Sequence, residues 1–325
     1  MLNPRDIAGK TVLVTGGAGF IGSHLVDRLI AEGAFHVAVI DNMFLGSEDN
    51  LADAQATGKL TLYKDDAEFA TSLDFIFQRH TIDVVFNCAT KALNYSFMNP
   101  ANAFGTNVTV ALNLLELLRR GAYKTLCHFS TSEVYGSAVY EPMDEQHPRS
   151  PTTTYAAGKA AADLAVESYV HMFGLDAFIV RPFNNYGPRQ NHKGLLAGVI
   201  PLTAWRIFNG IAPEIHGDGL QTRDYIHVRD TVDAVAKLFR VLPAGESVNI
   251  STDNQISIGE LVARIAQELG FQGEIVRKPA RAADVLSHNA SNQKVHALID
   301  YSLTDFDTGL RTTLEWYAQR LRHAR

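Results

Sequence analysis

The sequence predicts an α/β fold in which a doubly wound parallel sheet is followed by a smaller C-terminal α/β lobe. Three observations lead to this prediction. In the first half of the 325-residue chain, short β-branched runs alternate with longer helical patterns, which is typical of βαβ units and a parallel sheet. A glycine-rich turn lies between the first predicted strand and the first predicted helix. After Arg181 the composition changes to loops rich in Pro, Gly and Asn around isolated helices, where the smaller lobe is expected to begin.

The predicted elements follow in order along the chain. Thr11–Thr15 is the first strand, and apolar residues at helical spacing predict a helix over 21–30 that Gly33 ends. His36–Ile40 is the second strand, which Asp41 follows. Because crossovers between parallel strands are right-handed, these elements place helices on both faces of one sheet. The further predicted strands are 84–88, 126–129 and 177–180, and the further predicted helices are 108–118, 156–173 and 310–317.

The length allows two domains or one large one. We expect residues 1–180 to form the first domain and residues 181–325 to form mainly a second lobe, with some segments returning to the first domain. The chain has 29 Lys and Arg against 35 Asp and Glu, a net charge of −6. It therefore has no basic surplus for a nucleic-acid partner.

The composition also bears on the cellular compartment. Two cysteines, Cys88 and Cys127, lie in apolar runs that are predicted to be buried strands, which fits a reducing cytoplasm better than a disulfide scaffold. Neither an export signal nor an apolar run long enough to cross a bilayer is apparent in the sequence. We expect a cytoplasmic protein with no membrane partner.

The glycine turn has the spacing of a dinucleotide-binding site. Residues 15–22 read TGGAGFIG, with Gly16, Gly19 and Gly22 where a tight turn and a close approach to a pyrophosphate require glycine. Asp41 ends the second predicted strand, where a carboxylate would accept hydrogen bonds from ribose hydroxyls. Since Asp41 would repel a 2′-phosphate and no Arg follows it directly, the predicted cofactor is NAD rather than NADP.

Further residues are expected to line the cofactor site. Asp65 or Asp66, after the third apolar run, is a candidate acceptor for the adenine amino group, and a solvated acidic loop is an equally good explanation of the pair. The other predicted cofactor contacts are Phe20, Ile21, Asn42 and Ala89.

Tyr155 and Lys159 lie four residues apart in a predicted helix, so their side chains share one helix face. That helix follows the fifth strand segment, which ends in the polar cluster STSEVYG at 130–136, at the sheet edge where doubly wound folds bind ligands. A phenol is a poor base at neutral pH, and one ammonium about 4 Å away would contribute roughly the 4 kcal/mol needed to lower its pKa toward neutrality. We therefore expect Tyr155 to act as a base toward a substrate alcohol, with Thr131 hydrogen-bonded to the same oxygen.

These motifs resemble those of the extended short-chain dehydrogenase/reductase family, and specifically its NAD-dependent nucleotide-sugar epimerases and dehydratases. The resemblance covers nearly the whole chain. It implies a Rossmann domain for NAD, a substrate lobe for a nucleotide diphosphate sugar, and a homodimer formed through the two long helices at 108–118 and 156–173. The motifs that carry it are the turn at 15–25, Asn107, STSEVYG at 130–136, YxxxK at 155–159, RPFNNYGPRQ at 181–190, GDGLQTRDYIHVRD at 217–230, RAAD at 281–284 and LRTTLEWY at 310–317.

The resemblance also implies residue roles. Thr131, Tyr155 and Lys159 match the family's catalytic triad, and Tyr155 and Lys159 are expected to contact the cofactor as well. Asn184, Arg223 and Arg281 match positions that hold the nucleotide diphosphate or the sugar. Guanidinium groups suit phosphate, while ordinary surface ion pairs are the alternative explanation for both arginines.

The residues after the catalytic hydroxyl bear on the reaction. The family oxidises the sugar at C4 and later returns the hydride. Glu133 matches the carboxylate that 4,6-dehydratases use as a base at C5, while Ser132 stands where dehydratases of thymidine-linked glucose usually have Asp. The resemblance favours a nucleotide-sugar 4,6-dehydratase over a 4-epimerase or a UDP-glucuronate decarboxylase, although decarboxylases also have Thr-Ser-Glu. Glu133 as a structural acid that caps a helix, and the whole protein as a catalytically silent NAD-binding regulator, are further alternatives.

The segment NCATKALNYS at 87–96 departs from the sequence usual in the family after the fourth strand. Within it, Lys91 is a candidate contact for cofactor or substrate, and a solvated lysine is equally plausible. The twelve histidines show none of the spacings typical of metal ligands, so no metal site is predicted.

Overall fold

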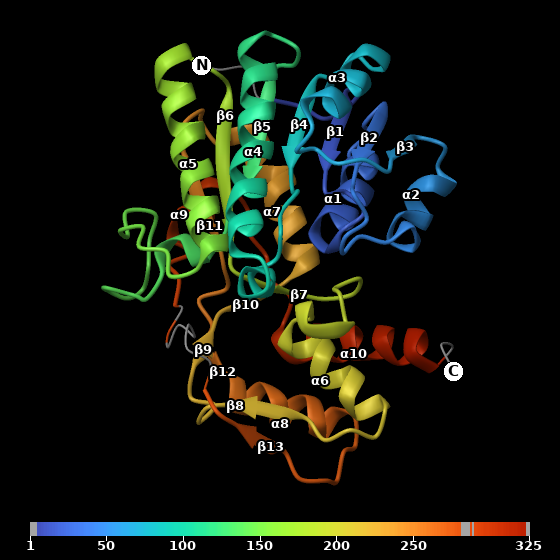
Figure 1. The fold of residues 1–325 in the computed structure, drawn as a ribbon, viewed down its shortest axis with the longest axis vertical. Helices are drawn as coiled ribbons and strands as arrows, with labels where there is room; N and C mark the ends of the chain where they lie inside the picture. Colours follow the sequence, from blue (N-terminus) through green and yellow to red (C-terminus); the bar gives the residue numbers. More distant parts are fainter. Residues whose placement is uncertain (1–4, 281–286, 288, 323–325) are drawn as a thin grey trace.

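A computed structural model of the protein describes residues 5–280, 287 and 289–322, and its larger part is built on one seven-stranded sheet (Figure 1). All neighbouring strands of this sheet are parallel, in the order β11-β6-β5-β4-β1-β2-β3. This confirms the predicted fold class. The strands are β1 (Thr11–Thr15), β2 (His36–Ile40), β3 (Leu60–Tyr63), β4 (Val84–Asn87), β5 (Thr125–Phe129), β6 (Ala177–Pro182) and β11 (Ser247–Ile250).

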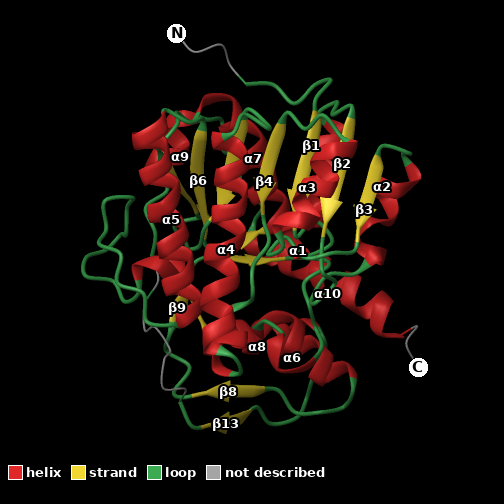
Figure 2. Cartoon of the chain, turned by 45° about the horizontal axis from the view of Figure 1, so that its top comes forward, coloured by secondary structure: helices red, strands yellow, loops and turns green. Residues whose placement is uncertain are grey.

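Helices cover both faces of the sheet (Figure 2). Side chains alternate along a strand, so Val12 and Val14 of β1 pack into the core on the side of α1 and α7, while Leu13 packs into the core on the side of α3, α4 and α5. Burial on both faces explains why the strands are almost continuously apolar. The covering helices are α1 (Phe20–Ala31), α7 (Val228–Val241) and α9 (Gln293–Leu298) on one face, and α3 (Ala70–Arg79), α4 (Pro100–Arg119) and α5 (Thr154–Phe173) on the other.

The two long helices begin and end at recognisable signals. The Asn99 side chain caps α4 by accepting from the Asn102 amide at 3.2 Å, and Pro100 occupies its first position. The Thr153 side chain caps α5 by accepting from the Ala156 amide at 3.2 Å. α4 starts at Pro100, eight residues before the predicted Val108. The prediction missed this first part because it used the apolar pattern alone, and the capping signal lies outside that pattern.

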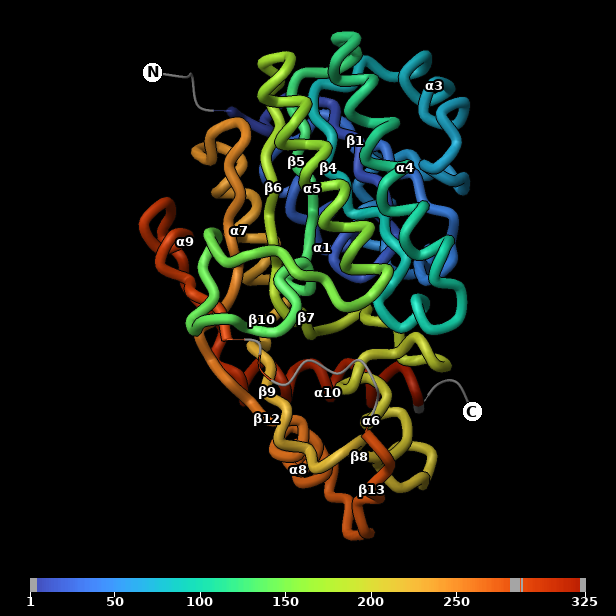
Figure 3. The backbone as a smooth tube through the Cα atoms, turned by 60° about the vertical axis from the view of Figure 1, so that its left-hand side comes forward, coloured from blue at the N-terminus to red at the C-terminus, as the bar shows by residue number. Residues whose placement is uncertain are grey.

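Most of the described residues after β6 form a smaller lobe (Figure 3). Its core is formed by apolar side chains of α6 (Val199–Phe208), α8 (Ile258–Glu268) and α10 (Phe306–Arg322). α10 contains the helix predicted at 310–317. Three two-stranded sheets complete the lobe: β7 (Asn184–Tyr186) with β10 (Tyr225–His227), β9 (Thr222–Arg223) with β12 (Ile256–Ser257), and β8 (Glu214–His216) with β13 (Val276–Lys278).

Three segments of this half of the chain, β11, α7 and α9, return to the large sheet. β11 pairs with β6 at its edge, and α7 packs against α1 beneath it. Short helical segments connect the main elements: α2 (Ala52–Ala56), η1 (Glu48–Leu51), η2 (Leu93–Phe97), η3 (Ser132–Tyr135) and η4 (Gly194–Leu196). In the part of the chain that the structure describes, no helix combines the length and apolarity needed to cross a bilayer.

Candidate active site

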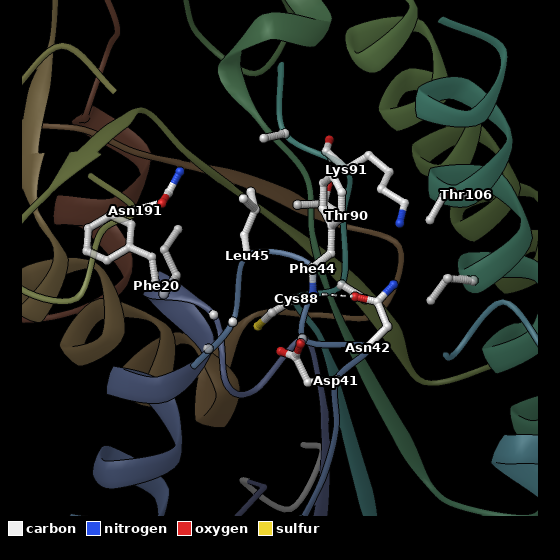
Figure 4. Close-up of a pocket in the computed structure, with 18 of the residues that line it drawn as sticks. Phe20, Asp41, Asn42, Phe44, Leu45, Cys88, Thr90, Lys91, Thr106 and Asn191 are labelled. Carbon is white, nitrogen blue, oxygen red and sulfur yellow. Dashed lines mark hydrogen bonds between the residues drawn. The ribbon is translucent and has the colours of Figure 1, made fainter. Parts of the chain in front are cut away.

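A pocket of about 370 Å³ opens at the carboxyl ends of β1, β2, β4 and β5 (Figure 4). Segments that are far apart in the chain meet here, as expected at this edge of a doubly wound sheet. The structure thus brings nearly all of the predicted cofactor residues together around one cavity. Those that line it are Gly16, Gly19, Phe20, Ile21, Gly22, Asp41, Asn42, Asp65, Asp66, Ala89 and Tyr155.

The glycine turn leaves no room for side chains. Gly16 has a φ of +66°, and a Cβ there would lie 2.8 Å from the amide nitrogen of Ala89. A Cβ on Gly22 would lie 2.2 Å from the carbonyl oxygen of Gly16. Gly19 is the N-cap of α1, whose first turn lines the pocket. The backbone amides at this helix end are therefore available to an anion in the pocket.

The carboxylate of Asp41 is fixed at the end of β2. It is 7% exposed, and its two oxygens accept from the amides of Ala18 at 2.9 Å and Met43 at 2.8 Å. Burial raises the pKa of Asp41, while these hydrogen bonds lower it. Beside it, the Asn42 amide donates to Asp66 Oδ2 at 2.7 Å, which ties the loop after β3 to the pocket wall.

A second pocket, of about 410 Å³, lies between the sheet edge and the smaller lobe. Thr131 and Tyr155 line both pockets, so their hydroxyl groups are located where the two cavities meet. A dinucleotide in the first pocket and a substrate in the second would meet at these two side chains. The other predicted residues that line the second pocket are Ser132, Glu133, Asn184 and Arg223.

The environment of Tyr155 differs from the prediction. The pKa of the Tyr155 phenol is raised to about 12, because burial and the Glu133 carboxylate, which raise it, outweigh the hydrogen bonds with the Thr131 and Thr90 hydroxyls, which lower it. The expected lowering of this pKa by Lys159 is therefore wrong for the protein on its own. The physical reason is that the loss of hydration of the phenolate outweighs the nearby polar groups.

Lys159 is buried below the two pockets and lines neither of them. Its Nζ donates to the carbonyl oxygen of Phe129 at 2.8 Å. Burial lowers the pKa of Lys159 to about 8, and the Asp163 carboxylate opposes that shift. The ammonium is thus held against the end of β5, behind the tyrosine.

Thr90 is a site residue that the sequence analysis did not identify. Its hydroxyl donates to Asn107 Oδ1 at 2.8 Å and also forms a hydrogen bond with the Tyr155 phenol. Asn107 in turn donates to the backbone oxygen of Tyr155 at 3.5 Å. Thr90 follows β4. Its position at the carboxyl end of a parallel strand, where doubly wound folds bind ligands, could have identified it as a site residue.

Lys91 is buried, so the interpretation as a solvated lysine is wrong. It is 8% exposed, and its Nζ lies 4.6 Å from the ring centroid of Phe44 and 5.9 Å from that of Tyr95. Figure 4 shows it beside Phe44 at the wall of the first pocket. The two aromatic faces stabilise the ammonium in place of water.

The predicted diphosphate contacts fall in the smaller lobe. Asn184 on β7 donates to the Asp224 backbone oxygen at 3.2 Å, and Arg223 on β9 donates to the Thr222 backbone oxygen at 2.8 Å. Arg281 lies outside the described residues. Among the described side chains, no group of three or more His, Cys, Asp or Glu is arranged to hold a metal ion.

The fold and these two joined pockets define the class of a dinucleotide-binding enzyme with a separate substrate lobe. Residues 13–313 match the family model of GDP-mannose 4,6 dehydratase. The chain belongs to the NAD-dependent nucleotide-sugar epimerase/dehydratase family, within the extended short-chain dehydrogenases/reductases, which confirms the resemblance seen in the sequence.

Relatives in this family include both 4-epimerases and 4,6-dehydratases. The chain is 33% identical to a putative UDP-glucose 4-epimerase of Methanocaldococcus jannaschii, over 94% of this chain and 97% of that one. The structure of a UDP-glucose 4-epimerase from Thermotoga maritima with UDP-glucose is similar at a TM-score of 0.90 and 31% identity, covering 96% of this chain and 99% of that one. A dTDP-glucose 4,6-dehydratase from Streptomyces venezuelae with NAD bound is also similar at a TM-score of 0.90, with 29% identity over 96% of this chain and 98% of that one.

Proposed function

We propose that this protein is an NAD-dependent nucleotide-sugar 4,6-dehydratase. The observation that carries the proposal is that Glu133 lines the same pocket as Thr131 and Tyr155. A ketone at C4 of a sugar acidifies the proton at C5, and a carboxylate beside the reacting hydroxyls is a suitable base for that proton. Loss of the C6 hydroxyl then leaves a double bond between C5 and C6, and return of the hydride to C6 with a proton to C5 gives a 4-keto-6-deoxy sugar.

The first pocket suits NAD. Its glycine turn permits close approach of the pyrophosphate, and Asp41 presents a fixed carboxylate to the ribose hydroxyls. The same carboxylate disfavours the additional phosphate of NADP. When bound, NAD accepts the hydride from C4 and returns it later, and its positive nicotinamide favours ionisation of a neighbouring phenol.

In this proposal, different residues of the protein carry out the successive proton transfers. Tyr155 takes the proton of the C4 hydroxyl, Thr131 holds the same oxygen by a hydrogen bond, and the Lys159 ammonium stabilises the phenolate. Glu133 removes the C5 proton. The hydroxyl leaving C6 takes a proton from Glu133 or from a water, because Ser132 is not an acid.

We infer that residues 1–180 bind most of the NAD and that residues 181–325 supply most of the contacts to the nucleotide diphosphate sugar. This division is supported by the lining of the second pocket, to which the smaller lobe contributes Asn184 and Arg223. The Arg223 guanidinium suits a diphosphate, which needs local cationic donors in a protein of net charge −6.

The proposal is tested by incubating the NAD-loaded protein with a panel of UDP-, dTDP-, GDP- and CDP-sugars and following product mass. We expect one nucleotide sugar to lose a single water. Glu133→Gln should still oxidise C4, seen as an NADH transient, but should fail to eliminate water. Loss of CO₂ from a uronic acid sugar would instead identify a decarboxylase, and absence of any NADH transient would favour a silent NAD-binding regulator.

A nucleotide-sugar 4-epimerase is the second candidate. It is favoured by the similarity to the 4-epimerases from Methanocaldococcus jannaschii and Thermotoga maritima. The same incubation separates the two reactions, because an epimerase yields an isomer of unchanged mass. In that case Glu133→Gln should leave the ratio of substrate to product isomer unaltered.

A further inference from the structure

A chain of buried hydrogen bonds runs below the cofactor pocket, from its wall into the sheet. The Ala89 amide donates to Thr15 Oγ1 at 3.2 Å, and the Thr15 hydroxyl donates to Asn87 Oδ1 at 2.7 Å. Asn87 Nδ2 then forms a hydrogen bond with His128 Nδ1 at 3.0 Å. The side chains of Thr15, Asn87 and His128 are at most 1% exposed. Their proton positions are therefore set by one another rather than by solvent.

This chain determines the tautomer of His128. Since Asn87 Oδ1 accepts from Thr15, its NH₂ group faces the imidazole, and His128 Nδ1 must be the acceptor. Burial and the charges of Lys159 and Arg181 lower the pKa of His128, so the ring is neutral and carries its proton on Nε2. That nitrogen faces Asp163 Oδ1 at 3.7 Å.

Asp163 is held from a second side by an arginine. Its Oδ2 accepts from Nε and Nη2 of Arg181, both at 3.0 Å. The same guanidinium also donates to Tyr135 and Ser247, at 3.2 and 2.8 Å. Asp163 and Arg181 are 0% and 2% exposed. The Ser130 hydroxyl also acts on the Asp163 carboxylate through a hydrogen bond that lowers its pKa, and Asp163 Oδ1 lies 3.7 Å from His128 Nε2.

Asp163 follows Lys159 by four residues on α5, so the two side chains share one face of the helix. Removal from water favours the neutral amine of Lys159, and the Asp163 carboxylate acts against this effect. The other titratable groups that act on the ammonium or feel its charge are Cys88 after β4 and His128 on β5. Burial keeps the Cys88 thiol protonated by raising its pKa. Burial raises the pKa of the Asp163 carboxyl, while the Arg181 guanidinium and the hydrogen bonds from Ser130 and Arg181 lower it, so the pairing with Arg181 favours the carboxylate form.

We propose that Asp163 is a positioning residue of the active site, which keeps the buried Lys159 protonated and is itself held in place by Arg181, with His128 Nε2 lying 3.7 Å from its other carboxylate oxygen. The inference rests on the proposed function, because it assumes that Tyr155 acts on the substrate with the help of the ammonium. Asp163 lines neither pocket, so it acts through Lys159 and not on substrate or cofactor.

The central test is Asp163→Asn, which keeps the shape and removes the charge. Titration of the protein labelled with [ε-¹³C]lysine, with the Lys159 signal assigned by its loss in Lys159→Met, reports the ammonium directly and needs no substrate. We expect Lys159 in Asp163→Asn to lose its proton at a pH lower by about one unit or more, a tenfold or greater fall in proton affinity. An unchanged Lys159 titration in folded Asp163→Asn would overturn the proposal.

Activity provides an independent readout. Asp163 raises the pKa of both Tyr155 and Lys159, so its removal should move both limbs of the pH profile of the NADH transient to lower pH. If Asp163 had only a structural role, Asp163→Asn would reduce the amplitude of the NADH transient and leave both limbs of its pH profile at the same pH. If no nucleotide sugar is oxidised by the wild type, the proposed function fails while the lysine titration still tests Asp163.

Further variants guard against loss of folding. Asp163→Glu keeps the charge and should restore the wild-type lysine titration. His128→Phe removes the Nε2 proton and should shift the titration of Lys159 in the same direction as Asp163→Asn, by less. Glu167→Gln is the matched control on α5, because Glu167 lies 3.8 Å from Arg181 but pairs with Arg149 at 2.8 Å near the surface. The proposal would be contradicted if the Lys159 titration shifted as much in Glu167→Gln as in Asp163→Asn. If Asp163→Asn does not fold, an unchanged Lys159 titration in His128→Phe would contradict it instead.

Discussion

Tyr155 is half-buried between the two pockets, where the cost of losing hydration dominates its ionisation. The sequence correctly suggested that Tyr155 would lie at the sheet edge with Thr131. Thr131 follows β5 and Tyr155 is near the start of α5, and the apolar pattern predicts the positions of both elements. The sequence suggested the wrong direction for the pKa of Tyr155, because burial depends on segments such as Thr90 and Ser96 that lie far away in the chain.

Tyr155→Phe removes the phenolic oxygen and leaves the ring. We expect it to abolish the NADH transient with nucleotide sugars while NAD affinity changes by less than about tenfold, because the glycine turn and Asp41 are untouched. Stopped-flow absorbance and NAD titration measure the two effects. Retained oxidation at C4 would remove Tyr155 from the role of base.

Lys159 should make stability depend on pH. Its pKa is about 8 in the folded protein against 10.5 for an ordinary lysine, so between these values the unfolded chain binds more protons than the folded one. The free energy of unfolding should therefore rise with pH across this window, by up to roughly 3 kcal/mol. Denaturant unfolding of wild type and Lys159→Met from pH 7.5 to 10.5 measures the effect, and parallel curves for the two proteins would contradict it.

At the scale of elements, most of the large sheet was predictable. β1 and β2 have the predicted bounds, and β4, β5 and β6 differ from prediction by one or two residues at an end, since β-branched runs bounded by turns are typical of buried strands. β11 was not predicted. Its four residues form a strand because β6 offers an unpaired edge, which is a property of the assembled sheet.

The packing of α4 on α5 explains the glycine in the YxxxK motif. A Cβ on Gly158 would lie 2.7 Å from the Phe104 backbone oxygen and 3.3 Å from Asn107 Cβ. The glycine allows α4 to approach α5 closely, which brings Asn107 within hydrogen-bonding distance of the backbone oxygen of Tyr155. A small residue is therefore required by the neighbouring helix.

Two helical glycines, Gly22 at the start of α1 and Gly105 on α4, differ in the space around them. Gly22→Ala places a methyl group against the Gly16 carbonyl oxygen and should reduce NAD affinity by at least about tenfold while costing roughly 1–3 kcal/mol of stability. Gly105→Ala on α4 meets nothing within 4 Å and should stabilise the helix by about 0.5–1 kcal/mol. Thermal unfolding and NAD titration of both variants measure these effects. An equal response of the two variants would argue against the steric explanation.

At the scale of the whole molecule, α4 and α5 lie side by side on one face of the sheet (Figure 1). Besides the apolar side chains that pack on the sheet, they expose Phe104, Leu112 and Leu164, at 40%, 37% and 52%. Exposed apolar patches of this kind favour association. We therefore propose that a second copy of the chain covers this face, as the family resemblance implies.

Leu164→Glu tests the proposed dimer, because a charge at the centre of an apolar interface is costly to bury. We expect this variant to be monomeric by light scattering coupled to size-exclusion chromatography, and the wild type to be dimeric. Phe35→Glu is the control, since Phe35 is 71% exposed between α1 and β2, away from α4 and α5. A wild type that is monomeric at micromolar concentrations would contradict the proposal.

The sequence by itself determined the alternation of strands and helices, the glycine turn and the polar cluster at 130–136, because these depend on local spacing and backbone requirements. Only the tertiary structure decided that Lys159 lies behind the pockets, that Lys91 is buried between aromatic rings, and that His128 and Asp163 face each other below the site. Burial and electrostatic environment arise from contacts between distant segments. No local pattern encodes them.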